Sequence, residues 1–209
     1  MSWNYIDPFT TDKSKCFQCN SSLVEDRNDP AEITVYTREG VKFAQHYGKE
    51  CPNKFCAIRF YCGYYTKCGE KVYNDLSDLG DYIITSDNTA FAIDYLYEVN
   101  LLILHGNNSF QALSDVYNQL HNFKISELVS RSTLNRQRLA SGYFLYALLE
   151  MAERTCIEVK LNKKEGLENA LLSSLGPLQQ NFSDKWNSDH KCDVPNCETT
   201  MIRDQLLIT

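Results

Sequence analysis

Polar and apolar positions alternate along residues 33–47, and this alternation predicts a β-hairpin. Residues 33–37 are all β-branched or aromatic, and in residues 41–47 one face would carry Val41, Phe43, Gln45 and Tyr47. The Arg38-Glu39-Gly40 segment between the two runs is typical of a tight turn. Three later segments rich in β-branched and aromatic residues predict further short strands: residues 57–66, residues 71–73 and, as a candidate fifth strand, residues 82–85. We expect the charged residues 25–30 to interrupt regular structure before the hairpin.

Apolar residues in the second half of the chain recur at the three- and four-residue spacing of amphipathic helices. Five segments are predicted helices on this basis: residues 87–105, 110–120, 125–129, 133–156 and 167–175. The expected N-caps are Ser86 or Asp87, Ser109, and Ser132 or Thr133, and the expected ends are Gly106 and Gly176-Pro177. Residues 157–161 could either extend the fourth helix or form a strand.

Cysteines in the first part of the chain occur in two close pairs, a pattern typical of a metal site. Two residues separate Cys16 from Cys19, and four separate Cys51 from Cys56. A short loop between two cysteines, here called a knuckle, lets both sulfurs point at one ion, and two knuckles complete the tetrahedral shell that Zn²⁺ prefers. His46 is a fifth candidate for four places, so the fourth ligand stays open between a cysteine and His46. We therefore expect a structural zinc site on a small β-sheet.

A second group of candidate ligands lies near the end of the sequence. His190, Cys192 and Cys197 form a knuckle-like motif with four residues between the thiols. Three ligands leave a tetrahedral ion incomplete, and neither cysteine nor histidine follows Cys197. These residues are therefore a possible second metal site that a partner or a remote cysteine would have to complete.

Together these patterns predict an α+β fold in which a small zinc-stapled antiparallel β-sheet precedes a helical half and a C-terminal Cys/His knuckle. The expected domains are residues 1–106, a zinc-binding β-sheet module with one packed helix, residues 107–176, a helical region, and residues 177–209, a cysteine knuckle with an incomplete ligand set. A sheet of four or five short strands is close to the size at which a core needs a metal or a disulfide for stability.

Composition narrows the environment and the partners that we expect. The 209 residues carry a formal charge of −6, and no apolar run approaches the roughly 20 residues that a membrane span needs. The first residues lack the basic and apolar regions of a signal peptide, so we expect an intracellular protein whose nine cysteines are reduced and available to metal. The acidic balance gives no overall basic surface for nucleic acid, and no small-molecule substrate is evident.

Two alternatives to a non-catalytic zinc module remain open. Arg136 and Arg138 lie in the long predicted helix and Arg131 lies just before it, so residues 109–151 could form a helix-turn-helix DNA-binding module instead of a bundle that closes the core. An open position on a metal would allow a metal-dependent nuclease or hydrolase, but the sequence contains neither an H-E-x-x-H motif nor a phosphate-binding loop. We therefore predict no catalytic residues and no enzymatic activity.

Several segments of the sequence together resemble a known protein family. They are Ile33-Thr-Val-Tyr-Thr-Arg-Glu-Gly40 with Phe43-Ala-Gln-His-Tyr47, the second knuckle Lys49-Glu-Cys-Pro-Asn-Lys-Phe-Cys56, Thr89-Ala-Phe-Ala-Ile-Asp-Tyr-Leu96, and Ser109-Phe110 with Val116-Tyr-Asn118. Over residues 16–150 the chain resembles the five-cysteine-cluster domain found with KDZ (Kyakuja–Dileera–Zisupton) transposases.

The resemblance implies both a ligand set and a role. By position, the metal-binding pattern of the family falls on Cys16, Cys19, Cys51 and Cys56, with His46 also matching. The terminal Cys192 and Cys197 resemble the start of a second cluster, but the residues that follow, 203–209, depart from the pattern that would supply further ligands. The resemblance implies a zinc-binding module of a transposon-derived protein that is located in the nucleus and contacts protein or DNA.

Overall fold

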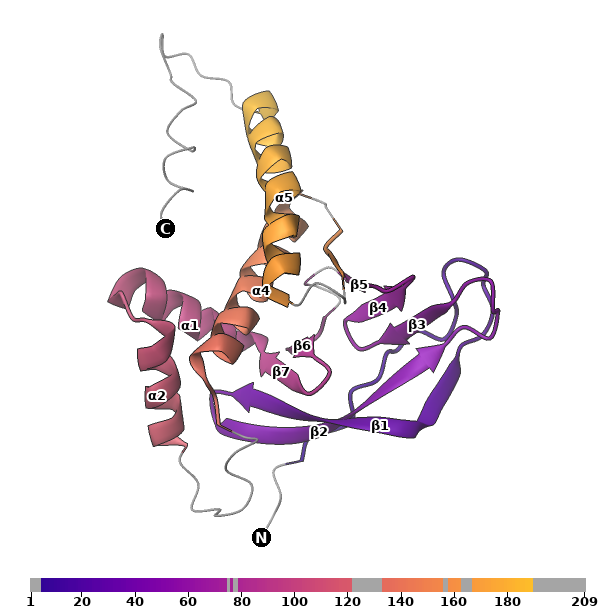
Figure 1. Cartoon of the computed structure of the whole chain (residues 1–209), viewed down its shortest axis with the longest axis horizontal. Coiled ribbons are helices and arrows are strands. Elements are labelled where there is room, and N and C mark those ends of the chain that lie inside the picture. Colours follow the sequence, from indigo (N-terminus) through magenta and orange to yellow (C-terminus); the bar gives the residue numbers. More distant parts are fainter. Residues whose placement is uncertain are drawn as a thin grey trace.

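The structure is a computed structural model that describes residues 5–74, 76, 79–121, 133–155, 158–162 and 167–189. Its strands are β1 Val24–Thr37, β2 Gly40–Glu50, β3 Ile58–Tyr61, β4 Tyr64–Lys67, β5 Glu70–Tyr73, β6 Tyr82–Ser86, β7 Thr89–Ala92 and β8 Lys160–Asn162. They form one eight-stranded sheet in the order β6-β7-β1-β2-β3-β4-β5-β8 (Figure 1). Neighbouring strands are antiparallel except β1 and β7, which are parallel.

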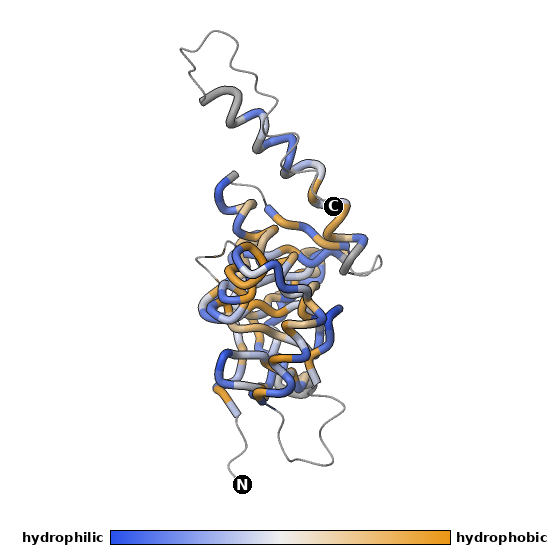
Figure 2. Tube along the Cα trace, turned by 90° about the vertical axis from the view of Figure 1, so that its left-hand side faces the viewer, coloured by the Kyte–Doolittle hydropathy of each residue, from blue (hydrophilic) through white to orange (hydrophobic). Residues whose placement is uncertain are grey.

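Four helices accompany the sheet in the described part of the chain: α1 Ile93–Gly106, α2 Phe110–Leu120, α4 Arg136–Thr155 and α5 Leu167–Asp189. Helix α1 packs on β1 and β7, α4 packs on β6, and α2 and α5 both pack on α4. The far end of α5 extends away from the body of the molecule (Figures 1 and 2). None of these four helices combines the length and apolarity that crossing a membrane requires. The predicted α+β class is confirmed.

The sheet curls until strands near its two ends meet. The hydroxyl of Tyr73 in β5 donates to the carbonyl oxygen of Ile84 in β6 over 2.9 Å, and the amine of Lys71 in β5 reaches the same oxygen over 3.4 Å. Five strands separate β5 from β6 in the sheet order. The sheet is therefore a half-barrel with a buried interior.

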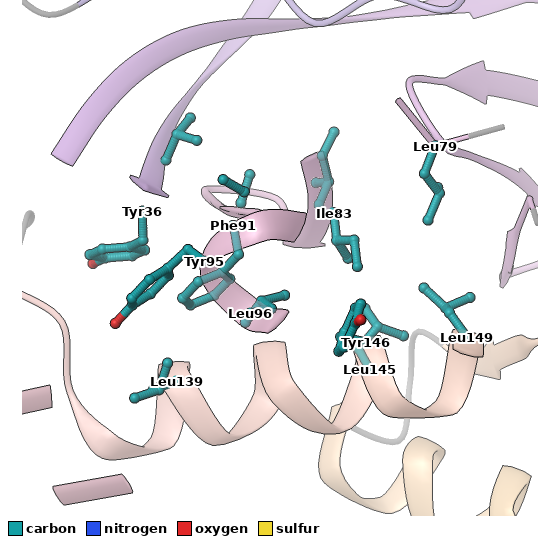
Figure 3. Close-up of a cluster of buried hydrophobic side chains, with 14 of the residues drawn as sticks. Tyr36, Leu79, Ile83, Phe91, Tyr95, Leu96, Leu139, Leu145, Tyr146 and Leu149 are labelled. Atoms are coloured by element: carbon teal, nitrogen blue, oxygen red, sulfur yellow. The ribbon is translucent and has the colours of Figure 1, made fainter. Parts of the chain in front are cut away.

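One hydrophobic core joins the sheet to the helices. It includes residues from Phe9 to Leu171 and takes side chains from all four helices. The rings of Tyr36 and Phe91 stack with centroids 5.1 Å apart, and Figure 3 shows α4 side chains facing the same cluster. The domain boundaries that we expect from the sequence at residues 106 and 176 stay predictions.

The hairpin prediction is confirmed, and its strands are longer than expected. Strand β1 begins at Val24, so the expectation that residues 25–30 interrupt regular structure is wrong. The pairing of β1 with β2 shifts register between Asp26 and Ala31, and such an irregularity lets a strand contain Pro30, which has no N–H for the ladder. Residues 57–66 form two strands rather than one.

That division has a clear cause in Gly63, which turns the chain between β3 and β4 with φ +77°. A Cβ at this position would also lie 2.5 Å from a methyl carbon of Leu79. The strands predicted at residues 71–73 and 82–85 are present as β5 and β6.

The predicted helix start at Ser86 or Asp87 is wrong. Ser86 ends β6, Asp87 lies in the turn to β7, and α1 begins only at Ile93. All residues of β7 are buried, and the strand pairs with β1, far away in the sequence. A strand that is buried on both faces shows no alternation of polar and apolar residues. The strand was therefore assigned to the helix, whose apolar spacing begins directly after it.

The N-cap predictions have different outcomes. Ser109 caps α2 as predicted, since its side chain accepts a hydrogen bond from the Ala112 amide over 3.2 Å. For α4 the prediction of Thr133 as the N-cap is wrong, because the side chain of Asn135 accepts the hydrogen bond from the Arg138 amide over 2.8 Å. The alternative cap Ser132 lies outside the described residues, as does the candidate helix at residues 125–129.

The last part of the chain departs from its predicted end. Residues 160–162 form β8, so the strand alternative for residues 157–161 holds for its final part. The predicted stop at Gly176-Pro177 is wrong, because α5 continues to Asp189. A proline removes one backbone hydrogen bond and can kink a helix without ending it.

Candidate metal centre

The first knuckle is a tight turn that precedes β1. The Cys16 amide donates to the Ser21 carbonyl oxygen over 2.9 Å, and the Asn20 amide donates to the Cys16 carbonyl oxygen over 2.8 Å. Asn20, directly after Cys19, has φ +58°, a left-handed conformation that asparagine tolerates better than most residues. These bonds close the loop without help from the rest of the chain.

The second knuckle connects β2 to β3. The Cys51 amide donates to the Ile58 carbonyl oxygen over 3.0 Å, which closes the loop at its base. Ala57, directly after Cys56, has φ +47°, the same left-handed conformation that Asn20 adopts in the first knuckle. An L-residue in this conformation costs roughly 1–2 kcal/mol, so the loop holds Ala57 there against its preference.

The two knuckles bring four thiol groups together. The sulfurs of Cys16, Cys19, Cys51 and Cys56 all lie within 4.8 Å of one another, and those of Cys19 and Cys51 are 3.4 Å apart. A tetrahedral site with metal–sulfur distances of about 2.3 Å has sulfur–sulfur edges of about 3.8 Å, so the group has the dimensions of such a site. All four thiols are free rather than joined in disulfides. The four cysteines can therefore hold a metal ion.

A small apolar cluster lies behind these thiols. Cys16 and Cys56 pack with Ile58 and Phe60, and this cluster is separate from the main core. Beside it, Arg59 of β3 forms an ion pair with Glu50 of β2 and lies 3.6 Å from Asp26 of β1. The base of the metal centre is thus fixed by three neighbouring strands.

Hydrogen bonds within the group favour ionisation of one thiol. The hydroxyl oxygen of Ser21 lies 3.3 Å from the Cys19 sulfur, and hydrogen bonding to Ser21 lowers the pKa of Cys19 to about 6. The pKa of Cys56 is raised to about 12, first by its hydrogen bond with Cys19 and then by burial, and burial also raises the pKa of Cys51. Cys19 therefore ionises before Cys51 and Cys56, and a bound cation would favour loss of their protons.

His46 lies outside the four-cysteine group, inside the half-barrel. It is 4% exposed, and its ring centroid lies 5.0 Å from that of Tyr61 and 6.0 Å from that of Tyr64. Among the described residues its Nε2 atom has no hydrogen-bond partner. Burial, and then the positive charge of Lys71, lower the pKa of His46 to about 4, so the ring is neutral at neutral pH.

The remaining candidate residues lie elsewhere. His190, Cys192 and Cys197 fall outside the described residues, so the possible second metal site stays a prediction. Of the cysteines not chosen as ligands, Cys62 is half-buried and Cys68 is exposed, and neither belongs to the four-cysteine group.

Sequence reasoning missed Lys71, a buried cation inside the half-barrel. Its side chain is 7% exposed, and its amine lies 4.0 Å from the ring centroid of Tyr64 and 5.2 Å from that of Tyr73. The faces of these rings stabilise a positive charge. The available signal was the placement of a lysine two residues before a tyrosine in a short strand, because alternate residues of a strand share a face.

A family model described as CxC5 like cysteine cluster associated with KDZ transposases matches residues 6–121, more than half of the chain. The matched residues contain both knuckles, strands β1 to β7 and helices α1 and α2. No curated protein and no solved structure matches the chain. The match confirms the family that the sequence resembles, over residues 6–121 rather than the expected 16–150.

Proposed function

Because the chain belongs to the family of CxC5-like cysteine clusters associated with KDZ transposases, we propose that it is a non-catalytic zinc-binding module of a transposon-derived protein. In this role it contacts protein or DNA in the nucleus. The observation that carries the proposal is the group of four cysteine sulfurs within 4.8 Å of one another.

The donor set supports zinc as the metal. Thiolates are soft ligands, and four of them in a tetrahedron are typical of structural zinc or iron–sulfur sites. The spacings of two and four residues within the cysteine pairs match those of zinc knuckles. Zinc in such a site stabilises the fold, because a small isolated apolar cluster needs a metal ion or a disulfide for stability.

The same donor set supports a structural role rather than catalysis. Catalytic zinc keeps one coordination position open for water or substrate, whereas four protein ligands fill a tetrahedral shell. The four cysteines are together sufficient for that shell, with His46 outside it. The nuclease or hydrolase alternative therefore has no support from this site.

The helix-turn-helix alternative has less support than the zinc module. A recognition helix needs side chains that are free to reach bases or phosphates. The guanidinium of Arg138 instead donates to the Tyr36 hydroxyl over 3.1 Å and to the Thr133 carbonyl oxygen over 3.2 Å, which ties α4 to β1. Arg131 lies outside the described residues.

Zinc content measured by native mass spectrometry tests the proposal. The full chain and the variant Cys68→Ser, which removes an exposed cysteine outside the group, should carry the same number of zinc ions. Cys56→Ser should carry one fewer, because it removes a buried member of the group. Equal zinc content in all three proteins would contradict the proposal.

A further inference from the structure

Each knuckle places a lysine and an exposed phenylalanine next to a buried cysteine. The first knuckle contains Lys15-Cys16-Phe17, and the second contains Lys54-Phe55-Cys56. The two cysteines are 1% and 5% exposed, whereas Phe17 is 59% exposed and Phe55 is 98% exposed. Since the two cysteine sulfurs lie within 4.8 Å of each other, both rings stand on neighbouring loops at one end of the sheet.

The loops restrain the ring of Phe17 and the backbone that carries the ring of Phe55. The ring of Phe17 packs edge-on against those of Phe60 and Tyr65, with centroids 5.6 Å and 5.1 Å away. The Phe55 amide donates to the side-chain oxygen of Asn53 over 3.1 Å, which fixes the backbone that carries the more exposed ring. A ring on a fixed loop loses less conformational entropy when it binds a partner.

The two segments that carry these rings contain more basic than acidic residues, although the whole chain is acidic and Asp12, Glu25 and Asp26 lie just beyond them. Residues 13–23 and 49–59 contain five basic residues and one acidic residue, against a formal charge of −6 for the whole chain. The single acidic residue, Glu50, is paired with Arg59. Three exposed lysines form no ion pair with any residue that the structure describes: Lys13, Lys15 and Lys54.

We propose that this knuckle surface, made of Lys13, Lys15, Phe17, Lys54 and Phe55, binds single-stranded nucleic acid. Unpaired bases stack on the two rings, and the lysines neutralise the phosphates, which is the combination that single-strand-binding surfaces use. A duplex keeps its bases stacked on one another, so it engages the lysines and not the rings. The inference rests on the proposed zinc module and names its partner, since the metal holds the two loops together.

Fluorescence anisotropy of labelled oligonucleotides tests the proposal with the zinc-loaded full chain. The probes are an unstructured single strand of about 12 nucleotides, within the usual site sizes of single-strand binders, a duplex of the same length, and a peptide of aspartate and glutamate. We expect the single strand to bind more tightly than the duplex and the peptide, and its affinity to fall steeply with salt. Lys54→Gln should reduce the salt slope by about one.

Variants of the exposed rings separate stacking from charge. Phe55→Ala should weaken single-strand binding about tenfold, which lies in the lower part of the range of losses measured when one base–aromatic stack is removed. Phe55→Trp should restore the affinity. Leu104→Ala removes a side chain of α1 that is 62% exposed and lies away from the knuckles, so it should leave affinity unchanged. A duplex or acidic peptide that binds as tightly as the single strand, or an affinity unaffected by Phe55→Ala, would overturn the proposal.

Zinc content measured on the same samples separates this inference from the proposed function. A chain that holds zinc through the four cysteines but binds no single strand would refute the knuckle surface and leave the zinc module intact. A chain without that zinc would refute both.

Discussion

At the scale of single residues, the environment of His46 makes stability depend on pH. The pKa of the buried imidazole is lowered from 6.5 to about 4, chiefly because burial disfavours its charged form. The unfolded chain therefore takes up this proton at a higher pH than the folded chain. The contribution of the neutral ring to stability is fully present above pH 6.5 and is lost as the pH falls toward 4.

Replacing His46 should remove this part of the pH dependence. Between about pH 7.5 and about pH 5, the unfolding free energy of the wild-type chain should fall by about 2 kcal/mol more than that of His46→Gln. Urea denaturation of both proteins at the two pH values measures the difference, and any metal lost at low pH affects both alike. Equal losses would show that the imidazole is not buried in its neutral form.

The four cysteines could be predicted from the sequence, whereas the place of His46 could not. Each knuckle is closed by its own backbone hydrogen bonds, from Cys16 to Ser21 and from Cys51 to Ile58, so short spacing is enough to identify it. The surroundings of His46 depend on how the whole sheet curls. That curl involves contacts between β5 and β6, which are consecutive in the sequence but have five strands between them in the sheet.

At the scale of elements, α4 packs so closely on the sheet that one of its positions requires glycine. A Cβ at Gly142 would lie 2.8 Å from ring atoms of Phe91, which is completely buried in β7. Glycine costs a helix about 1 kcal/mol relative to alanine. At this position the close approach of helix and strand offsets that cost.

Two glycine-to-alanine variants in helices should therefore differ in their effect on stability. Gly142→Ala should lower the unfolding free energy by roughly 1–3 kcal/mol, because the new methyl group overpacks the core. At Gly176 in α5 a Cβ meets no atom within 4 Å outside its chain neighbours, but Pro177 follows, and proline disfavours a helical conformation for a preceding residue with a Cβ, so Gly176→Ala should change the unfolding free energy by less than about 1 kcal/mol. Thermal or urea unfolding measures both, and no destabilisation by Gly142→Ala would contradict the packing of α4 on β7.

Sequence patterns within one segment predicted helices and strands well, but they did not predict which distant segments pair. The hairpin of β1 and β2 and the Ser109 cap depend on neighbouring residues, so the sequence was sufficient for both. The parallel pairing of β7 with β1 joins residues 55 positions apart, such as Thr34 and Thr89, and no local pattern indicates it. The helix start at Ile93 was missed for the same reason.

At the scale of the whole molecule, the metal centre and the main core are two separate hydrophobic clusters. The small cluster contains few apolar side chains beside its cysteines, so we expect it to depend on the metal. The main core takes side chains from the sheet and from all four helices, so we expect it to persist without metal.

Metal removal should therefore unfold one end of the sheet and spare the rest. Treatment with a zinc chelator should speed hydrogen exchange at the Cys51 and Cys56 amides, which are hydrogen-bonded within the second knuckle. Amides in the middle of α4 should keep their protection, and added zinc should restore the knuckles. Global loss of protection, or no change at the knuckles, would contradict this division.

The absorption spectrum of the chain loaded with Co²⁺ shows whether the four cysteines share one metal ion. His190, Cys192 and Cys197 are first replaced so that the possible second site cannot contribute. A Co²⁺ ion bound by the four cysteines should give intense sulfur-to-cobalt charge-transfer bands and tetrahedral ligand-field bands, unchanged by His46→Gln and weakened by replacing each of the four cysteines with serine. A pale octahedral spectrum, or one altered by His46→Gln and not by Cys56→Ser, would contradict a metal ion shared by the four cysteines.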